Sequence, residues 1–179
     1  MLISKAREFA CKHHSEQKYG EYPYVVHLDA VAELIQQYGE PAVVIAYLHD
    51  VVEDTSITLP HIEKEFGKLI ADCVAVLTDG PGKDRKERKT RTYAKMARVC
   101  GETEIALLVK AADRLANMRA CIADKKERLL KVYKTEYRVF KEAAYRSGRC
   151  EEIWAELAEL NTVKLLSTSD AGIQRGGVE

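Results

Sequence analysis

The stretch AYLHDVVEDT, residues 46–55, places four ionisable side chains inside an apolar run. Its first residues continue the apolar segment AVVIAYL, residues 42–48, which is typical of a central helix. Burying a charge without a partner costs on the order of several kcal/mol, comparable to the whole stability margin of a protein. The chain therefore either exposes these side chains at a solvated helix end or provides a partner for them. The four side chains are His49, Asp50, Glu53 and Asp54.

A divalent cation is the partner that the residue types favour. Residues four apart share a helix face, so a helix through this stretch would set His49 beside Glu53 and Asp50 beside Asp54. The apolar residues that precede His49 argue against a solvated helix end. A histidine together with carboxylates suits Mn²⁺, Mg²⁺, Fe²⁺ or Zn²⁺. The stretch therefore predicts part of a metal site.

Further ligands must come from elsewhere in the chain, because two neighbours do not fill a coordination shell. His27 follows YPYVV, and Asp113 interrupts the apolar segment LLVKAADRLANMR. With His49 and Asp50 they would form a four-ligand set from three helices, leaving positions for water and substrate. Two alternatives stay open on the residues alone. His27 could be a hydrogen-bonded core histidine, and Asp113 could pair with Arg114 as an ordinary helix ion pair.

The bulk properties indicate one folded domain without a general affinity for charged polymers. A chain of 179 residues can bury a core of its own, and its net charge of zero predicts no whole-molecule attraction to nucleic acid or membrane. No apolar run approaches the length of a membrane span, and the N-terminus has no signal-peptide pattern. Five widely spaced cysteines, with no C-x-x-C pair, favour a reduced, cytoplasmic protein.

The apolar spacing is helical nearly everywhere, and no segment alternates as a strand would. Gly39 and Gly67 are expected to end helices, and Thr58 is expected to cap one. The prediction is a compact all-α bundle of about eight or nine helices. It forms a single domain over residues 1–167, with a disordered tail over 168–179. The expected helices cover residues 2–14, 25–39, 40–55, 58–67, 68–80, 84–101, 103–123, 125–148 and 150–166.

The motifs resemble those of a known family. The order H…HD…D is similar to the metal signature of the HD phosphohydrolase superfamily. The segments YPYVVH, LHDVVEDT, EFG and VKAADRLANMR resemble, more narrowly, the hydrolase domain of the RelA/SpoT alarmone enzymes. The small stand-alone forms, such as the metazoan SpoT homologue, are the nearest type, and the resemblance spans roughly residues 4–150. HD alone indicates only the superfamily, whereas HDxxEDT with a later KxxDRxxN indicates this branch.

The resemblance implies an all-α HD-domain fold and a reaction. The reaction is Mn²⁺-dependent removal of pyrophosphate from the 3′ position of guanosine 3′,5′-bis-polyphosphates, (p)ppGpp, which leaves GDP or GTP. Glu53 and Asp54 match the family's catalytic acidic pair, and which of the two is the base stays open. The four residues that match the metal-ligand positions are His27, His49, Asp50 and Asp113.

The resemblance also implies substrate contacts, with one departure from the family. Asn117 matches a nucleotide-contacting position, and Lys110 is expected to lie near the substrate. The loop before His27 usually carries a basic pair, whereas this chain offers only Lys18 followed by Tyr19. This departure affects recognition of the base more than the chemistry.

The segment KDRKERKTRTYAKMAR, residues 83–98, carries eight Lys or Arg and two acids in a neutral chain. One interpretation is a mobile clamp for polyphosphate, because a local positive field raises affinity for phosphate groups. Lys86 and Lys89 are the candidates, together with Arg88 and Arg91. The other interpretation is a solvated helix with internal ion pairs. RNA binding is disfavoured because the segment lacks an aromatic platform.

Two other functions and an interface remain as alternatives. The chain could be an HD phosphohydrolase for another nucleotide, such as NADPH, an adenosine alarmone, a dNTP or a nucleoside monophosphate. It could also bind an alarmone without catalysis. The apolar stripes over residues 125–147 and in EEIWAELAEL indicate core packing, or a homodimer interface through Trp154, Leu157 and Leu160. A monomer or a homodimer, and a role in the stringent response or in toxin neutralisation, are both compatible with the sequence.

Overall fold

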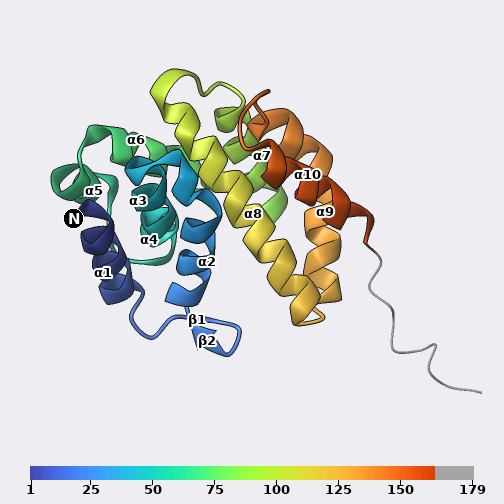
Figure 1. The fold of residues 1–179 in the computed structure, drawn as a ribbon, viewed down its shortest axis with the longest axis horizontal. Coiled ribbons are helices and arrows are strands. Elements are labelled where there is room, and N and C mark those ends of the chain that lie inside the picture. The colour runs from blue at the N-terminus through green and yellow to red at the C-terminus, as the bar shows by residue number, and fades with distance from the viewer. Residues whose placement is uncertain (164–179) are drawn as a thin grey trace, which may run out of the picture.

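Helices form most of the chain in the computed structural model, which describes residues 1–163 (Figure 1). The all-α prediction is confirmed. The tail predicted over residues 168–179 lies outside the described residues. The α-helices are α1 (Leu2–His14), α2 (Val25–Ile35), α3 (Glu40–Leu48), α4 (Val51–Asp54), α5 (Leu59–Phe66), α6 (Lys68–Leu77), α7 (Arg85–Met96), α8 (Ile105–Ala123), α9 (Glu127–Ala144) and α10 (Glu151–Thr162). Two 3-10 helices, Gln36–Tyr38 and Gly101–Glu104, precede α3 and α8.

Helix α3 forms the centre of the N-terminal half. Every residue of the run 42–48 is buried, and the helix packs against α1, α2, α6 and α8. Helix α8 crosses the middle of the molecule, with α1, α3, α5 and α6 on one side and α9 and α10 on the other (Figure 1). An apolar run buried on all faces explains why the sequence here shows no polar stripe.

The helix predicted over residues 40–55 is broken in two, and this is one place where the expectation is wrong. Helix α3 ends at Leu48, and α4 begins at Val51. His49 and Asp50 form the junction, with Asp50 at φ −105° and ψ −5°. The backbone N–H groups of Glu53 and Asp54 still bond to the Asp50 carbonyl, so helical winding resumes at once. The break divides one expected helix into two and gives ten α-helices within residues 1–163.

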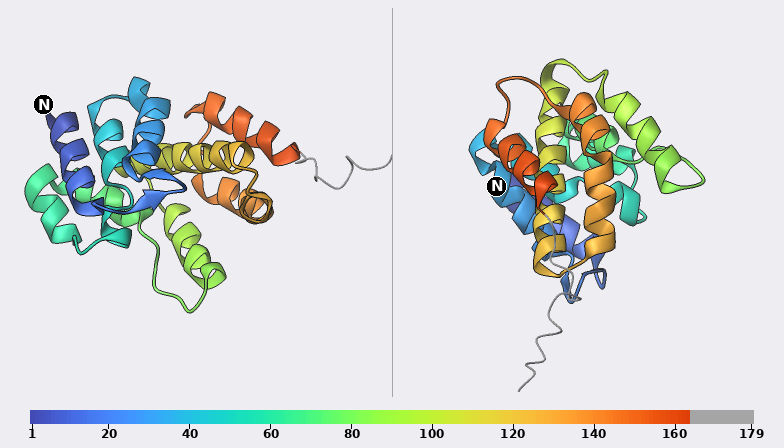
Figure 2. Two further views of the ribbon diagram at one scale, coloured as in Figure 1. Left: turned by 90° about the horizontal axis from the view of Figure 1, so that it is seen from below. Right: turned by 90° about the vertical axis from the view of Figure 1, so that its right-hand side faces the viewer.

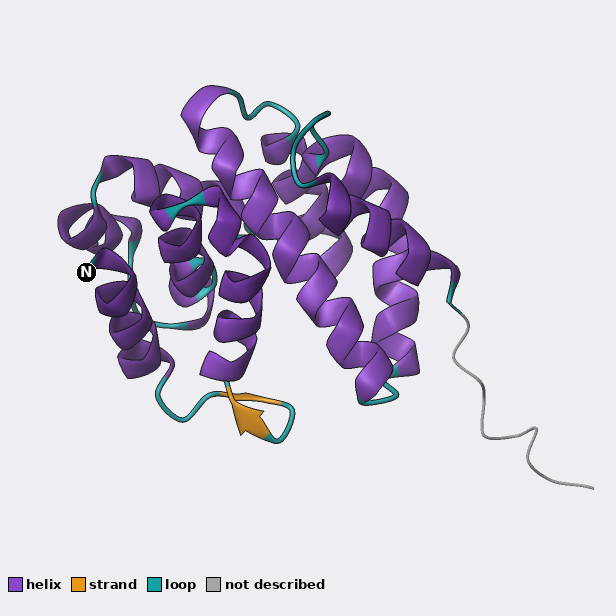
Figure 3. Ribbon diagram, in the orientation of Figure 1, coloured by secondary structure: helices purple, strands orange, loops and turns teal. Residues whose placement is uncertain are grey.

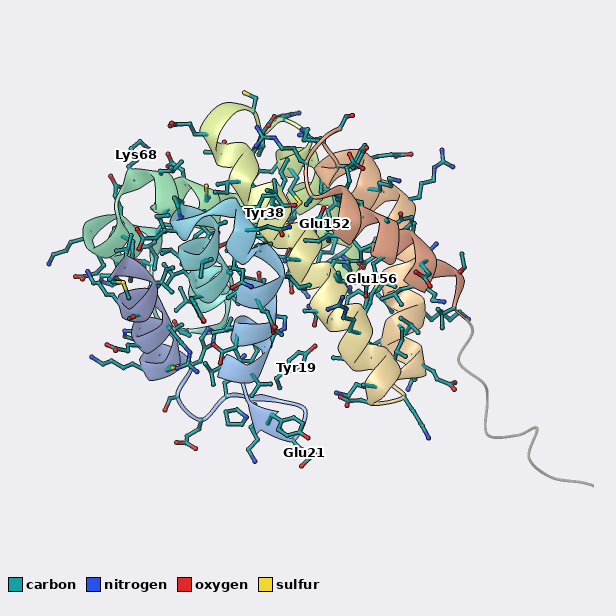
Figure 4. The ribbon with its side chains drawn as sticks, in the orientation of Figure 1. Tyr19, Glu21, Tyr38, Lys68, Glu152 and Glu156 are labelled. Carbon is teal, nitrogen blue, oxygen red and sulfur yellow. The ribbon has the colours of Figure 1, made fainter. Side chains whose placement is uncertain are left out.

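The loop predicted over residues 15–24 contains a small hairpin that sequence reasoning missed. Strands β1 (Lys18–Tyr19) and β2 (Tyr22–Pro23) pair in antiparallel register around Gly20, whose φ is +63° (Figure 3). Strands of two residues are too short to show an alternating pattern. The hairpin brings Tyr19 to the start of α2 (Figure 4).

The expected helix ends are found where turn chemistry is strong. Thr58 and His61 form a capping box at the start of α5. Gly39 and Gly67 follow their helices with φ of +92° and +89°, a conformation that favours glycine. These local signals fix where the helices around the site begin and end.

The C-terminal layer is buried within the chain itself. Trp154 and Leu157 on α10 are 3 % and 0 % exposed, and Leu160 packs partly buried against the same core. The core-packing interpretation is therefore confirmed for Trp154 and Leu157, which are too buried to form a dimer interface. All five cysteines are free thiols. Across residues 1–163, none of the helices has the length and apolarity that a membrane span requires.

Candidate metal centre and its surroundings

Three separate parts of the fold bring the predicted ligands together. His27 lies in the first turn of α2, His49 and Asp50 form the junction between α3 and α4, and Asp113 lies in the middle of α8. Ligand-type atoms of His27, His49 and Asp50 all lie within 4.8 Å of one another. Asp113 Oδ1 lies 3.3 Å from His27 Nε2 and 3.7 Å from His49 Nε2. The structure thus brings together the four residues that the sequence predicted as ligands.

The protonation of His49 shows why the cluster fits a cation. His49 is fully buried, and its Nδ1 lies 2.7 Å from the Ala46 carbonyl oxygen, which only a protonated nitrogen satisfies. Its other ring nitrogen, Nε2, points at Asp50 Oδ2, 3.0 Å away. Nε2 has no hydrogen-bond partner of acceptable geometry in the described structure. A proton or a metal ion on Nε2 would match the facing carboxylate, and a histidine whose other nitrogen binds a carbonyl is a typical metal ligand.

The pKa shifts of the clustered residues also show that positive charge is favoured here. Burial alone would lower the pKa of His49, but the facing carboxylates of Asp50 and Asp113 raise it to about 10. Burial would raise the pKa of Asp50, whereas His49 holds it well below its ordinary value. The pKa of Asp113 is likewise lowered, against the effect of burial, by Lys110 and the two histidines. Positive charge near these carboxylates is therefore strongly favoured.

Asp113 is fixed by residues on its own helix. Lys110 Nζ lies 2.8 Å from Asp113 Oδ2, and Asn117 Nδ2 donates to Asp113 Oδ1 at 2.5 Å. The spacings of three and four residues place all three side chains on one face of α8. The alternative pairing of Asp113 with Arg114 is not observed, because Arg114 bonds to Glu136. Lys110 and Asn117 thus lie at the candidate centre, as predicted.

Two tyrosines of the hairpin region support the candidate ligands, and the sequence analysis assigned neither of them a role. The Tyr24 hydroxyl donates to Asp50 Oδ2 at 2.5 Å. The Tyr19 hydroxyl donates to Asn117 Oδ1 at 2.8 Å, and the Tyr19 ring stacks on His27 with centroids 4.7 Å apart. Figure 4 shows Tyr19 between the start of α2 and helix α8. Lys18, its neighbour, is exposed and forms no side-chain hydrogen bond or ion pair within residues 1–163.

Glu53 lies in α4, three residues after Asp50, and is connected through Asp79 to the basic helix α7. Its Oε2 accepts a hydrogen bond from the Asp79 backbone N–H at 3.1 Å. Partial burial and the Asp79 carboxylate raise the pKa of Glu53, against the opposing effects of that N–H and of Lys110. Asp79 in turn binds Lys89 Nζ at 2.8 Å and accepts from the Thr92 hydroxyl. A carboxyl group with a raised pKa beside buried ligands is suited to acid–base work.

Asp54 faces a different part of the fold from Glu53. Its Oδ2 accepts a hydrogen bond from Gln17 Nε2 at 2.8 Å. Gln17 Oε1 lies 2.8 Å from Nδ1 of the buried His14. The two candidate catalytic acids are therefore held by different segments, Glu53 by the loop before α7 and Asp54 by the turn after α1. The predicted side-by-side pairs, His49 with Glu53 and Asp50 with Asp54, form no direct bond within the described residues.

A basic cleft of about 770 Å³ lies between α7 and α9. Helix α7 and the loop before it stand out from the other helices (Figure 2). Lys86 and Lys89 both line the cleft, and burial together with Lys110 lowers the pKa of Lys89. The cationic side chains of this cleft are Arg85, Lys86, Lys89, Arg128 and Lys131.

A second cavity of about 500 Å³ borders His27 on the hairpin side. Tyr19 and Tyr22 form one wall, and the alanines of α8 form an apolar floor. Aromatic walls over an apolar floor suit a flat ring. The cavity is lined by the hairpin, α2 and the C-terminal half of α8, whereas the basic cleft is lined by α7 and α9.

Three functional candidates were missed because their signals are long-range. Asp79 follows α6 in the ordinary-looking segment TDG, and only the fold places it beside Glu53. Tyr24 lies in the quoted motif YPYVVH, but its bond to Asp50 depends on the orientation of α2. Gln17 and Asp54 are 37 positions apart in the chain. A polar side chain in a loop carries no sequence pattern that predicts such a partner.

Comparisons with known proteins agree with the motifs. Residues 6–159 match the family described as HD domain. The guanosine-3′,5′-bis(diphosphate) 3′-pyrophosphohydrolase of Aquifex aeolicus (strain VF5) is 31 % identical over 88 % of this chain, which corresponds to 23 % of the relative. The probable enzyme of the same name from Synechocystis sp. (strain ATCC 27184 / PCC 6803 / Kazusa) is 34 % identical over 99 % of this chain and 24 % of its own length. The chain thus spans about a quarter of the curated relatives it matches.

Solved structures share the fold. The protein reported as a metazoan ortholog of SpoT that hydrolyzes ppGpp and plays a role in starvation responses aligns with a TM-score of 0.71. It is 23 % identical, and the alignment covers 90 % of this chain and 96 % of that one. A Listeria monocytogenes EGD-e protein aligns with a TM-score of 0.63 at 26 % identity, over 78 % of this chain and 95 % of its own. The helical arrangement is therefore that of an established fold.

Proposed function

This chain belongs to the HD-domain family, and from that premise we propose that it hydrolyses (p)ppGpp at the 3′ position. The products would be pyrophosphate and GDP or GTP. Curated relatives named as guanosine-3′,5′-bis(diphosphate) 3′-pyrophosphohydrolases match nearly the whole chain, which supports this substrate. Residues 1–167 are proposed as the single hydrolase domain, and the family match over residues 6–159 supports that extent. A cytoplasmic location and a monomer or homodimer stay predictions.

The observation that carries the proposal is the unbalanced buried cluster at the α3–α4 junction. His49 Nε2 is buried, has no hydrogen-bond partner in the described structure and lies 3.0 Å from a carboxylate oxygen. HD domains are metal-dependent, and this chain has a His/Asp group with the geometry to hold an ion. His27, His49, Asp50 and Asp113 are the proposed ligands, and Mn²⁺ is the proposed ion because nitrogen and carboxylate ligands suit it. When bound, such an ion lowers the pKa of water and neutralises charge on phosphate oxygens.

Glu53 and Asp54 are proposed as the residues that orient the attacking water and accept its proton. Both lie in the short α4 directly after the ligand junction, so their backbones are fixed relative to Asp50. The raised pKa of Glu53 brings its carboxylate closer to the proton affinity that a general base needs. Breaking the bond between phosphorus and the 3′ oxygen requires one proton to leave the water and one to reach the departing ribose oxygen. A carboxylate that gains the first proton is positioned to supply the second.

The two cavities divide the recognition of a charged nucleotide between them. The basic cleft between α7 and α9 is proposed to hold phosphate groups through Lys86 and Lys89. Lys110 would stabilise negative charge close to Asp113. The aromatic cavity beside His27 is proposed to hold the base, with Asn117 at its edge through Tyr19. Lys18 is proposed as a peripheral contact of the nucleotide, reached from the exposed hairpin.

A different nucleotide is the second candidate, and the hairpin favours keeping it. The position next to Lys18 holds Tyr19. Its ring stacks on His27, and its hydroxyl donates a hydrogen bond to Asn117 Oδ1. This arrangement offers stacking surface in place of a positive charge. NADPH, adenosine alarmones, dNTPs and nucleoside monophosphates therefore belong in the substrate panel.

The test is a turnover assay of purified protein with Mn²⁺ and each nucleotide, with the products separated by anion-exchange chromatography. GDP and pyrophosphate from ppGpp, absent in the Glu53→Gln, Asp54→Asn double variant, would support the proposed reaction. Rapid turnover of another nucleotide with ppGpp intact would replace it by the second candidate. Binding of ppGpp without turnover of anything in the panel would favour a binding module.

A further inference from the structure

We infer that His14 and Gln17 are positioning residues that hold Asp54 in its working orientation. The inference rests on the proposed function, because Asp54 matters only if the site hydrolyses a nucleotide. Neither residue touches the candidate metal ligands through a hydrogen bond within residues 1–163, and neither was singled out by the sequence. Both come from the end of α1 and the turn after it, remote in sequence from α4.

The hydrogen bonds form a chain with only one consistent direction. An ionised Asp54 accepts hydrogen bonds and donates none, so Gln17 must present its amide nitrogen, which lies 2.8 Å from Asp54 Oδ2. The Gln17 carbonyl oxygen then faces His14 Nδ1 at 2.8 Å and requires a proton on that nitrogen. His14 therefore determines which way the glutamine amide points. Reversing the amide would set oxygen against carboxylate, and the Asp54 contact would be lost.

His14, where this series of hydrogen bonds begins, is held firmly in place, as a positioning role requires. His14 is 5 % exposed, and its ring stacks on Tyr24 at 4.5 Å between centroids. The backbone N–H of Gln17 bonds to the His14 carbonyl, and the N–H of Tyr24 bonds to the Gln17 carbonyl. Tyr24 in turn donates to Asp50. The same small unit thus contacts one candidate ligand and one candidate catalytic acid.

Asp54 itself has little other support. Its side chain is exposed, and Gln17 is its one side-chain partner within the described chain. The bond engages Oδ2 and leaves Oδ1 without a protein partner across residues 1–163. Gln17 therefore restrains the carboxylate through one oxygen and leaves the other oxygen available. An exposed acid without this contact would sample several rotamers, and misplacement of a reacting group by about 1 Å can cost on the order of 100-fold in rate.

The experiment compares two substitutions of Gln17. A residue that only fills space would tolerate Gln17→Glu, whereas a positioning residue would lose activity in both variants. Gln17→Glu keeps shape and volume but replaces the donor by a second carboxylate. Gln17→Leu removes both polar contacts. We expect kcat to fall roughly 10- to 100-fold in both variants at pH 8, with KM and Mn²⁺ affinity within about twofold of wild type. Gln37→Glu, on the surface beside Glu152, is the matched control and keeps wild-type kcat.

Two results would overturn the inference. Wild-type kcat in Gln17→Glu would mean that the residue only fills space, and a rise in KM without loss of kcat would mean that it binds substrate. A double-mutant cycle decides further, because Gln17→Leu should have no additional effect in an Asp54→Asn background if it acts through Asp54. An equal loss of kcat in both backgrounds would contradict the inference that Gln17 acts through Asp54. Thermal melts of every variant establish that a loss of kcat is not a loss of folding.

A readout without substrate separates this inference from the proposed function. If the wild type hydrolyses no nucleotide, the proposed function fails. NMR then tests the hydrogen bonds from His14 through Gln17 to Asp54 by themselves. Asp54→Ala should move the side-chain amide resonances of Gln17 and the ring resonances of His14, and leave those of Gln37 unchanged. Unmoved Gln17 and His14 resonances would contradict the positioning contact whatever the activity.

Discussion

Two buried polar clusters lie within this small protein, one at the α3–α4 junction and one around Glu136 on α9. In the second, Arg85 binds both Glu136 oxygens, at 2.8 and 3.1 Å. Arg114 adds a third ionic contact at 3.0 Å, and its guanidinium lies over the rings of Tyr133 and Phe140. Every charge there has a partner of opposite sign or an aromatic face. At the junction, by contrast, two carboxylates converge on the ring nitrogens of two buried histidines, and His49 Nε2 has no hydrogen-bond partner in the described structure.

The difference separates a structural cluster from a functional one. Around Glu136, donors and acceptors match, and the result ties α7, α8 and α9 together. At the junction, one lysine stands against two carboxylates, and a buried imidazole nitrogen stays without a hydrogen-bond partner in the described structure. A cluster with surplus acceptors is incomplete without a cation, and buried polar groups are costly unless matched. The following changes test this contrast, from the largest expected effect to the smallest.

Asp50→Ala should abolish Mn²⁺ binding and bring nucleotide hydrolysis below detection. The substitution removes the carboxylate that faces both histidines. It should also lower the stability of the metal-free protein, because His49 and Tyr24 lose the carboxylate that they contact. Isothermal titration with Mn²⁺ and a thermal melt in chelator measure the two effects. Asp72→Ala, at an exposed ion pair with Lys68, is the control that keeps both properties. Full metal affinity in Asp50→Ala would contradict the ligand assignment.

Glu53→Gln should leave Mn²⁺ bound and reduce kcat by roughly 10²- to 10⁴-fold, the range expected for loss of a general base. The amide keeps the shape of the side chain and the contact to the Asp79 N–H, but it cannot take up a proton. Metal titration and steady-state kinetics on one preparation give both quantities. Unchanged turnover in this variant, combined with a large loss in Asp54→Asn, would assign the base to Asp54.

Glu136→Ala should destabilise the fold by about 3 kcal/mol, because it leaves Arg114 buried without its carboxylate. Mn²⁺ affinity measured well below the melting temperature should not change, since the cluster lies outside the ligand set. Urea unfolding monitored by circular dichroism gives the free energy. A loss of metal affinity with unchanged stability would show that the two clusters have been assigned in reverse.

Lys89→Met should raise KM for ppGpp about tenfold with little effect on kcat, since one charge-assisted contact to phosphate is lost. Lys89 also binds Asp79, so the melting temperature serves as the check on structure. Lys68→Met on the far, exposed end of α6 is the matched control. An unchanged KM would remove the cleft between α7 and α9 from the substrate path.

The pH dependence of stability should be the smallest of these effects. Burial would raise the pKa of Glu136, but its contacts with Arg85 and Arg114 outweigh burial and lower that pKa. Because the folded-state pKa lies below the unfolded one, the stabilisation is complete above the unfolded pKa and disappears as pH falls through the folded value. The stability gap between wild type and Glu136→Gln should therefore narrow on acidification below about pH 4. A gap that widens instead would reverse the sign of the interaction.

The contrast also explains what could be predicted from the sequence. Helix ends at Gly39, Thr58 and Gly67 follow from local chemistry and were predicted correctly. The meeting of His27, His49, Asp50 and Asp113 followed from polar residues that interrupt apolar helices, together with the motif resemblance. Both kinds of signal lie within a few residues of the position they describe.

The missed features depend on contacts between distant segments. A single apolar run predicted one helix over residues 40–55. In the structure α3 ends at Leu48, in a region packed against four other helices, and its apolar pattern contains no signal for that end. Asp79 and Gln17 are polar residues in loops, and only the tertiary fold turns them towards Glu53 and Asp54. Their roles stay predictions until the variants are measured.

The most direct test of the central claim is anomalous diffraction from crystals of the wild-type protein grown with Mn²⁺, collected near the manganese absorption edge. The account predicts one strong anomalous peak bounded by His27 Nε2, His49 Nε2 and the carboxylates of Asp50 and Asp113. It also predicts no peak beside Glu136. Saturating Mn²⁺ with no density at the α3–α4 junction, or with density at other residues, would contradict the claim that the unbalanced cluster is a metal centre.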